Sequence, residues 1–191
     1  MEYNNHWELA GKHAYLSPSG GAWVNYDAEK MANYYQNQLK KEEGTFLHDL
    51  ASRLIKIRKR LPSQKNSFNQ FVNDAIGLRM KSEIALFYSM NIFGTADALV
   101  YKEKEKHLQI HDLKTGAKEA PFRQLDIYSA LFCLEYNKNP FDLTFEERIY
   151  QGVGYKDNFP DPEDIKKIMD KIVMLDQVID SQKATYQGLF I

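Results

Sequence analysis

The sequence contains a single cysteine, and this scarcity excludes a disulfide framework within the chain. It also excludes an iron–sulphur cluster, which needs several cysteine ligands. Cys133 lies in the apolar run ALFCLEY, where a buried core thiol is expected rather than a nucleophile. Low cysteine usage is typical of proteins in a reducing compartment, so we expect a cytoplasmic, intracellular location.

Long hydrophobic runs are missing as well. No apolar stretch approaches the length that crosses a bilayer, and the N-terminal residues MEYNNHWELAGKH lack the apolar segment of a signal peptide. We therefore expect no membrane partner.

A strong charge of one sign is also absent, because the formal net charge is −1. This excludes a generally basic nucleic-acid-binding protein, so any affinity for DNA must come from a local patch. The run RLIKIRKRLPSQK is one candidate, with Arg53, Lys56, Lys59 and Arg60 as its principal cations. The same run also fits the solvated face of an amphipathic helix, and the sequence leaves both interpretations open.

The 191 residues are 43% hydrophobic, which predicts one globular domain with a core of its own. Apolar periodicity and capping residues predict its helices. Ser17 and Pro18 open a short helix, and Asp27 caps the next one. The further expected helices cover residues 28–41, 44–60 (ended by Pro62), 67–81, 121–136 and 162–184.

Alternating and β-branched segments predict strands at 83–89, 92–101, 107–114 and 147–156. The turns between the first three are short, which favours antiparallel neighbours. Helices before, between and after the strands predict an α/β domain with a mixed central sheet flanked by helices.

Two of these strands carry acidic residues that are expensive to bury alone. Asp97 lies in NIFGTADALVY, and Asp112 and Lys114 form Asp-x-Lys in HLQIHDLKTG. Alternation places Asp112 and Lys114 on one otherwise apolar face. Two carboxylates and a lysine can hold a divalent metal ion and orient a water beside it, which is the chemistry of phosphodiester cleavage. An exposed Asp–Lys pair of little energetic value is the alternative.

Four motifs in order, GTFLH, GTADALV, HDLKTG and QLDIY, resemble those of the PD-(D/E)xK nuclease superfamily. Within it they are most similar to the RecB-like and phage-type exonucleases. The match runs from about Gly44 to Tyr155. The resemblance implies a restriction-endonuclease-like core over residues 44–191, with residues 1–43 as an N-terminal helical extension.

The resemblance also implies roles for particular residues. Asp97, Asp112 and Lys114 would be catalytic, and the two aspartates would bind Mg²⁺ or Mn²⁺. The Leu113 carbonyl and the His48 imidazole would be further ligands, and an imidazole favours Mn²⁺. A hydrogen-bonded core histidine is the alternative for His48.

Gln124 and Tyr128 are four residues apart on one helix face. The resemblance implies that they contact the DNA backbone and support Lys114; a core tyrosine beside a surface glutamine is the alternative. Glu83 opens a strand and is a candidate acid at, or next to, the metal site. His107 and His111 alternate onto the face opposite Asp112, which excludes them from the site.

The function implied is a metal-dependent DNA nuclease, with an exonuclease favoured, in DNA recombination, repair or phage DNA processing. Its partners would be DNA and a recombination or replication protein, and a phage-encoded enzyme would act in the host cytoplasm. A structure-selective endonuclease and a non-catalytic nucleic-acid-binding subunit on a nuclease fold are the alternatives.

Overall fold

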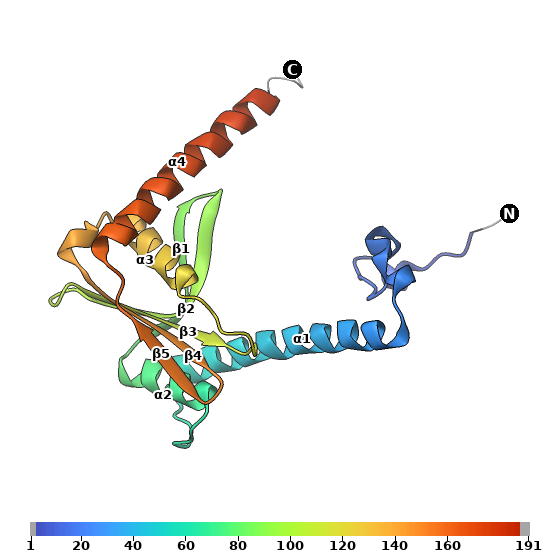
Figure 1. The fold of residues 1–191 in the computed structure, drawn as a ribbon, viewed down its shortest axis with the longest axis horizontal. Helices are drawn as coiled ribbons and strands as arrows, with labels where there is room; N and C mark the ends of the chain where they lie inside the picture. The colour runs from blue at the N-terminus through green and yellow to red at the C-terminus, as the bar shows by residue number, and fades with distance from the viewer. Residues whose placement is uncertain (1–2, 188–191) are drawn as a thin grey trace. The chain divides into compact units, whose positions relative to one another are not determined.

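The computed structural model describes residues 3–187. The chain divides into two compact units, Met1–Glu43 and Gly44–Ile191. The second unit is an α/β structure with a five-stranded mixed sheet flanked by helices (Figure 1), so the coarse prediction of the fold is confirmed.

The first unit consists of two short 3₁₀ helices, η1 (Trp7–Leu9) and η2 (Pro18–Asn25), and the start of helix α1 (Ala28–Lys56). Asp27 caps α1 as expected, because its carboxylate accepts a 2.7 Å hydrogen bond from the Lys30 amide. None of residues 3–43 is buried. Edge-to-face rings, such as those of Tyr15 and Tyr35 with centroids 5.2 Å apart, lie against each other within this unit.

Helix α1 differs from its prediction at two places. The expected break near Gly44 is wrong, because the helix continues through this residue. A side chain at Gly44 would place its Cβ atom 2.9 Å from Thr115 Oγ1, so the glycine permits close packing against the residue that follows β3. The expected end near Arg60 is also wrong, because α1 ends at Lys56 and Arg58 turns the chain with φ 54°.

Helix α2 (Ser67–Gly77) begins at Asn66, whose side chain accepts a 2.7 Å hydrogen bond from the Asn69 amide. It ends four residues before the predicted position at 81. Arg79 has φ 58°, and the chain continues directly into the first strand.

The sheet has the order β1-β2-β3-β4-β5. Neighbouring strands are antiparallel as expected for β1–β2 and β2–β3, and also for β4–β5, whereas β3 and β4 are parallel. The single strand predicted at 147–156 is wrong: it is a hairpin that turns at Gly152, where φ is 66°. The strand bounds are β1 Lys81–Ser89, β2 Ile92–Lys102, β3 His107–Lys114, β4 Thr144–Gln151 and β5 Gly154–Asn158.

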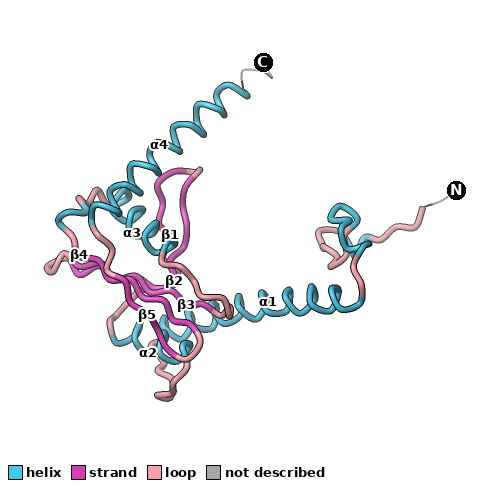
Figure 2. The backbone as a smooth tube through the Cα atoms, viewed as in Figure 1, coloured by secondary structure: helices cyan, strands magenta, loops and turns pink. Residues whose placement is uncertain are grey.

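Helices cover both faces of the sheet (Figures 1 and 2), and a hydrophobic cluster packs on each face. On one face, helix α3 (Arg123–Glu135) and the start of α4 (Pro162–Gln187) cover residues such as Leu99 and Ile110. A short 3₁₀ helix, η3 (Pro140–Asp142), connects α3 to β4. On the other face, α2 and the C-terminal half of α1 cover Leu113 and Tyr150. Cys133 is buried in the first cluster as expected.

Within residues 3–187, no helix combines the length and the apolar character needed to cross a membrane.

Candidate active site

The candidate site forms where β2 and β3 stop pairing. Their backbone ladder runs from Lys102↔His107 to Ala98↔His111. Beyond that pair, the Leu113 amide donates a 2.8 Å hydrogen bond to Asp97 Oδ2 instead of to a backbone carbonyl. Leu99 and Ile110 are register partners, so alternation places Asp97 and Asp112 side by side on the same face. The two acids of the sequence motif are therefore brought together.

Asp112 is the buried acid of the pair, with 2% of its surface exposed. Lys114 Nζ lies 3.1 Å from Asp112 Oδ1 and 3.0 Å from Oδ2, but its hydrogen bond is directed to Oδ1. Oδ2 is buried and accepts no hydrogen bond from residues 3–187. Burial and then the Asp97 carboxylate raise the pKa of Asp112 to about 6, despite the opposing effect of Lys114.

His48 belongs to α1 and contacts the cluster formed by Asp97, Asp112 and Lys114. Its Nδ1 atom lies 3.2 Å from Asp97 Oδ1, and the interaction with Asp97 raises the pKa of the imidazole. Both side chains are partly buried. His48 is thus a partner of Asp97 in this arrangement, as either a ligand beside it or the group that orients it.

Lys114 is held by a chain of hydrogen bonds that ends on β2. Its Nζ atom donates to Gln124 Oε1 at 2.7 Å, and Gln124 Nε2 donates to the Tyr128 hydroxyl at 3.0 Å. The hydroxyl then donates to the Thr95 carbonyl at 2.7 Å. Tyr128 is buried and Gln124 is exposed, but these contacts tie both of them to Lys114.

Gly94 makes room for this chain. A Cβ atom at this position would lie 2.9 Å from Tyr128 Cε1, so any larger residue would push the ring away. The glycine in GTADALV therefore permits close approach of α3 to β2, a role that only the packed structure reveals.

Glu83 lies opposite Asp97 in the β1–β2 register, between the pairs Ser82↔Ala98 and Ile84↔Ala96. Its backbone has φ 54°, an unfavourable conformation for a residue with a Cβ atom and unusual inside a strand. Partial burial and then Asp97 raise the pKa of its carboxyl group. The strained acid thus lies at the edge of the cluster, beside Asp97 and His48.

The four cations proposed to contact DNA do not lie on one helix. Arg53 and Lys56 are exposed on the last turn of α1, whereas Lys59 and Arg60 follow the end of the helix. The expectation that all four share a helical surface is therefore wrong, because Arg58 reverses the chain before Lys59.

The histidines of β3 lie apart from the cluster, as expected from alternation. His111 is fully buried on the opposite face, where its Nδ1 atom is 3.2 Å from the Tyr150 hydroxyl. Burial and then Arg148 lower its pKa to about 3, so the imidazole is neutral. His107 Nδ1 lies 2.8 Å from Thr144 Oγ1 on the neighbouring strand.

The cluster offers a divalent ion few protein ligands. Among residues 3–187, no three His, Cys, Asp or Glu side chains are grouped so that they could hold a metal ion. Mg²⁺ nevertheless needs only one or two protein carboxylates when water and phosphate oxygens complete its shell. Asp97 and Asp112 meet this requirement, and the buried Oδ2 of Asp112 is an acceptor that has no hydrogen-bond donor within those residues. The two carboxylates therefore fit a Mg²⁺ or Mn²⁺ ion whose other ligands are water or phosphate oxygens.

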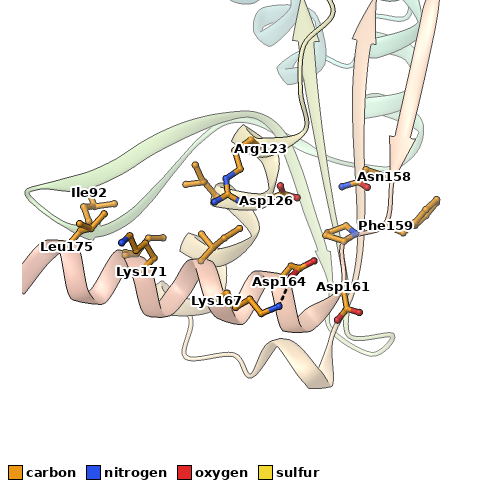
Figure 3. A pocket seen from close by; sticks show the side chains of 14 residues that line it. Ile92, Arg123, Asp126, Asn158, Phe159, Asp161, Asp164, Lys167, Lys171 and Leu175 are labelled. Carbon is orange, nitrogen blue, oxygen red and sulfur yellow. Dashed lines mark hydrogen bonds and ion pairs between the residues drawn. The ribbon is translucent and has the colours of Figure 1, made fainter.

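A wide pocket of about 970 Å³ lies elsewhere, between α3, α4 and the loop after β5 (Figure 3). An ion pair lies on its wall, where Lys167 Nζ is 3.0 Å from Asp164 Oδ1. None of the cluster side chains lines this pocket. Arg123 lines it, although the next residue, Gln124, contacts Lys114.

No protein-family model and no curated protein matches the sequence. The assignment of a function therefore depends on the geometry of the cluster and on the motifs that form it.

Proposed function

We propose that the chain is a metal-dependent deoxyribonuclease of the PD-(D/E)xK type. The observation that carries this proposal is the continuous set of contacts around Asp97, Asp112 and Lys114. Residues from α1, β2, β3 and α3 meet there, and four separate sequence motifs supply them. A solvated Asp–Lys pair would not require a buried carboxylate oxygen without a donor or a three-residue support for the lysine.

Asp97 and Asp112 would hold the metal ion, with the Leu113 carbonyl and His48 as the further ligands that the motifs imply. When bound, Mg²⁺ or Mn²⁺ supplies a Lewis acid that offsets the phosphate charge and lowers the pKa of a bound water. Burial and mutual repulsion make the unliganded pair of carboxylates unfavourable, which supports a cation at this position.

Lys114 would orient the attacking water. Its ammonium group has three N–H donors, and two of them are directed to Asp112 Oδ1 and Gln124 Oε1. In the proposed mechanism the remaining N–H would be directed to a water or a phosphate oxygen. A lysine fixed from two sides needs little reorganisation as negative charge develops on the phosphate.

We propose an exonuclease rather than an endonuclease, because the motif set resembles that of RecB-like exonucleases. The test uses the full chain with Mg²⁺ or Mn²⁺ and three substrates: end-labelled linear duplex, covalently closed circular duplex and single-stranded DNA. Linear DNA should shorten progressively while closed circles survive, and EDTA should stop the reaction. The Lys114→Ala variant is the matched control for contaminating nucleases.

Each other outcome supports a different conclusion. Efficient cutting of closed circles would indicate a structure-selective endonuclease. DNA binding with no cleavage, and no heat of Mn²⁺ binding in calorimetry, would indicate a non-catalytic nucleic-acid-binding subunit. Equal activity of the wild type and Lys114→Ala would contradict the proposed mechanism.

A further inference from the structure

A second pocket, of about 330 Å³, lies between the ends of α1 and α2 and the start of β1. We call it the basic pocket. Its lining includes four exposed cations and no acidic residue. They are Lys56, Arg58, Arg79 and Lys81. Within residues 3–187 their side chains form no ion pair or hydrogen bond, so four positive charges face one concave surface without a bonded anionic partner.

The two arginines have an unusual backbone conformation. Helix α1 ends with Lys59 N bonded to Leu54 O at 3.0 Å and Arg58 N bonded to Ile55 O at 3.1 Å. This is a Schellman motif, in which the residue at the position of Arg58 is left-handed and is most often glycine. Arg58 has φ 54° there.

Helix α2 ends in the same way. Met80 N is bonded to Ala75 O at 2.8 Å and Arg79 N to Ile76 O at 3.2 Å, and Arg79 has φ 58°. Two helices therefore terminate with a left-handed arginine where glycine would be less strained, and both arginines line the same pocket.

Cations near helix C-termini are often explained by the helix dipole alone. That explanation accounts for Lys56 in the last turn of α1. It does not account for arginine in place of glycine at both left-handed positions, nor for Lys81, which begins a strand. A bound anion accounts for all four cations, because it gives each of them a partner.

The pocket is adjacent to the candidate active site. Lys56 and His48 lie on the same helix, about 12 Å apart along its axis at 1.5 Å per residue. On the side of the pocket formed by β1, Lys81 and Ser82 directly precede Glu83, the strained acid opposite Asp97. A DNA strand carries a phosphate about every 3.4 Å of helix rise, so a strand at the candidate site has further phosphates within this distance.

We infer that the basic pocket binds phosphates of the DNA strand a few nucleotides from the cleaved bond. The inference rests on the proposed function, because it assumes that the strand passes the cluster of Asp97, Asp112 and Lys114. The pocket would fix the register of the strand, and the apolar floor formed by Ile55, Ile76 and Met80 would keep the four cations close together.

The test uses glycine substitutions, which remove the charge and relieve the backbone strain at once. The double variant Arg58→Gly/Arg79→Gly should keep or raise its thermal unfolding midpoint, yet bind DNA more weakly. Binding of a labelled duplex oligonucleotide is measured by anisotropy in EDTA at several salt concentrations. The slope of log K against log[salt] should fall by about two units, one for each phosphate that an arginine no longer neutralises.

Lys106→Gly is the matched control, because Lys106 is also a left-handed cation, with φ 49°, in the turn between β2 and β3. It should leave the affinity and salt slope unchanged. Lys56→Gln/Lys81→Gln, which alters no left-handed residue, should weaken binding in the same way as the arginine pair. Wild-type affinity and salt slope in Arg58→Gly/Arg79→Gly would overturn the inference. A lowered thermal unfolding midpoint in that variant, together with unchanged DNA binding by Lys56→Gln/Lys81→Gln, would overturn it as well.

Competition with inorganic phosphate distinguishes a strand site from a site for a small anion. Phosphate at millimolar concentration should displace the oligonucleotide no better than chloride of equal ionic strength. Displacement by phosphate alone would overturn the assignment to a strand. Since binding is measured without a metal ion, a chain that binds through the basic pocket but never cleaves would refute only the proposed function.

Discussion

The Lys114 ammonium donates a 2.7 Å hydrogen bond to Gln124 Oε1, which joins the end of β3 to the first turn of α3. The lysine of the Asp-x-Lys motif is therefore positioned by a residue of a different motif. This relationship gives the glutamine and tyrosine of QLDIY a physical role, because Tyr128 holds Gln124 in turn.

Cleavage should depend on each member of the central triad. Asp97→Asn, Asp112→Asn and Lys114→Ala should each reduce turnover by about 10²–10³-fold or more, since each removes a charge that stabilises the transition state. DNA binding should fall less. Single-turnover rates with end-labelled DNA, beside anisotropy measurements of binding, test this. Wild-type turnover in any one variant would remove that residue from the mechanism.

Gln124 and Tyr128 should act through Lys114 as positioning residues. Tyr128→Phe keeps the buried ring but removes the hydrogen bonds to Thr95 and Gln124, so turnover should fall by about 10-fold with little loss of stability. Gln124→Met should lower turnover by about 10-fold with little change in DNA affinity, because Lys114 loses one of the acceptors that fix its ammonium group. Unchanged turnover in Gln124→Met would mean that Gln124 is only a surface residue.

Gly94→Ala should impair activity without direct contact to the metal ligands. The new methyl group would displace the Tyr128 ring and with it the support of Lys114. We expect a decrease of about 10-fold in turnover and a destabilisation of about 1–3 kcal/mol from overpacking. Gly154→Ala is the control, because nothing lies within 4 Å of a Cβ atom built there. Equal behaviour of the two variants would contradict the packing argument.

His48→Ala should weaken metal binding while the chain stays folded. His48 lies 3.2 Å from Asp97 and belongs to a helix whose core contacts come from other residues, such as Ala51 and Ile55. Calorimetric titration should show a larger decrease in affinity for Mn²⁺ than for Mg²⁺, since imidazole suits softer ions. An equal decrease for the two ions would instead indicate that His48 only orients Asp97.

Stability should depend on pH through Glu147, which is fully buried and accepts hydrogen bonds from Ser129 and Asn158. Burial, followed by the Asp126 carboxyl group, raises the pKa of Glu147 from its ordinary value of 4.5 to about 8. The folded chain therefore keeps a proton that the unfolded chain loses above about pH 4.5. The free energy of unfolding should consequently fall as the pH rises from 4.5 to 8.

The Glu147→Gln variant isolates this contribution, since the amide keeps the shape but cannot ionise. Relative to the wild type, it should become more stable by a few kcal/mol between about pH 5 and pH 8, because one pKa unit corresponds to about 1.4 kcal/mol. Denaturant unfolding of both chains at the two pH values gives the difference. A constant difference across this range would show that Glu147 is already ionised in the folded chain.

Much of the fold follows from local patterns in the sequence. Apolar residues at three- and four-residue spacing predict α4, and alternation with short turns predicts the antiparallel order of β1, β2 and β3. The cluster was predictable for a related reason. Asp112 and Lys114 are fixed on one face by alternation, and Gln124 and Tyr128 by helical spacing, whereas the meeting of these elements was implied by the resemblance of the four motifs.

The remaining features depend on contacts between segments that are distant in the sequence. Local preference predicts a helix break at Gly44, but packing against Thr115 makes this residue part of a continuous helix. The residues of β4 and β5 have the pattern of one strand, because alternation continues across a tight turn.

Local sequence thus determined which residues form helices and strands and which chemical groups their faces carry. The tertiary structure decided how those groups meet. Glu83 has a left-handed backbone inside a strand, which no local preference predicts, since such a residue favours the β region there. The pairing of β1 with β2 places Glu83 opposite Asp97, and the tertiary structure brings Arg58 and Arg79, from the ends of two different helices, to one pocket.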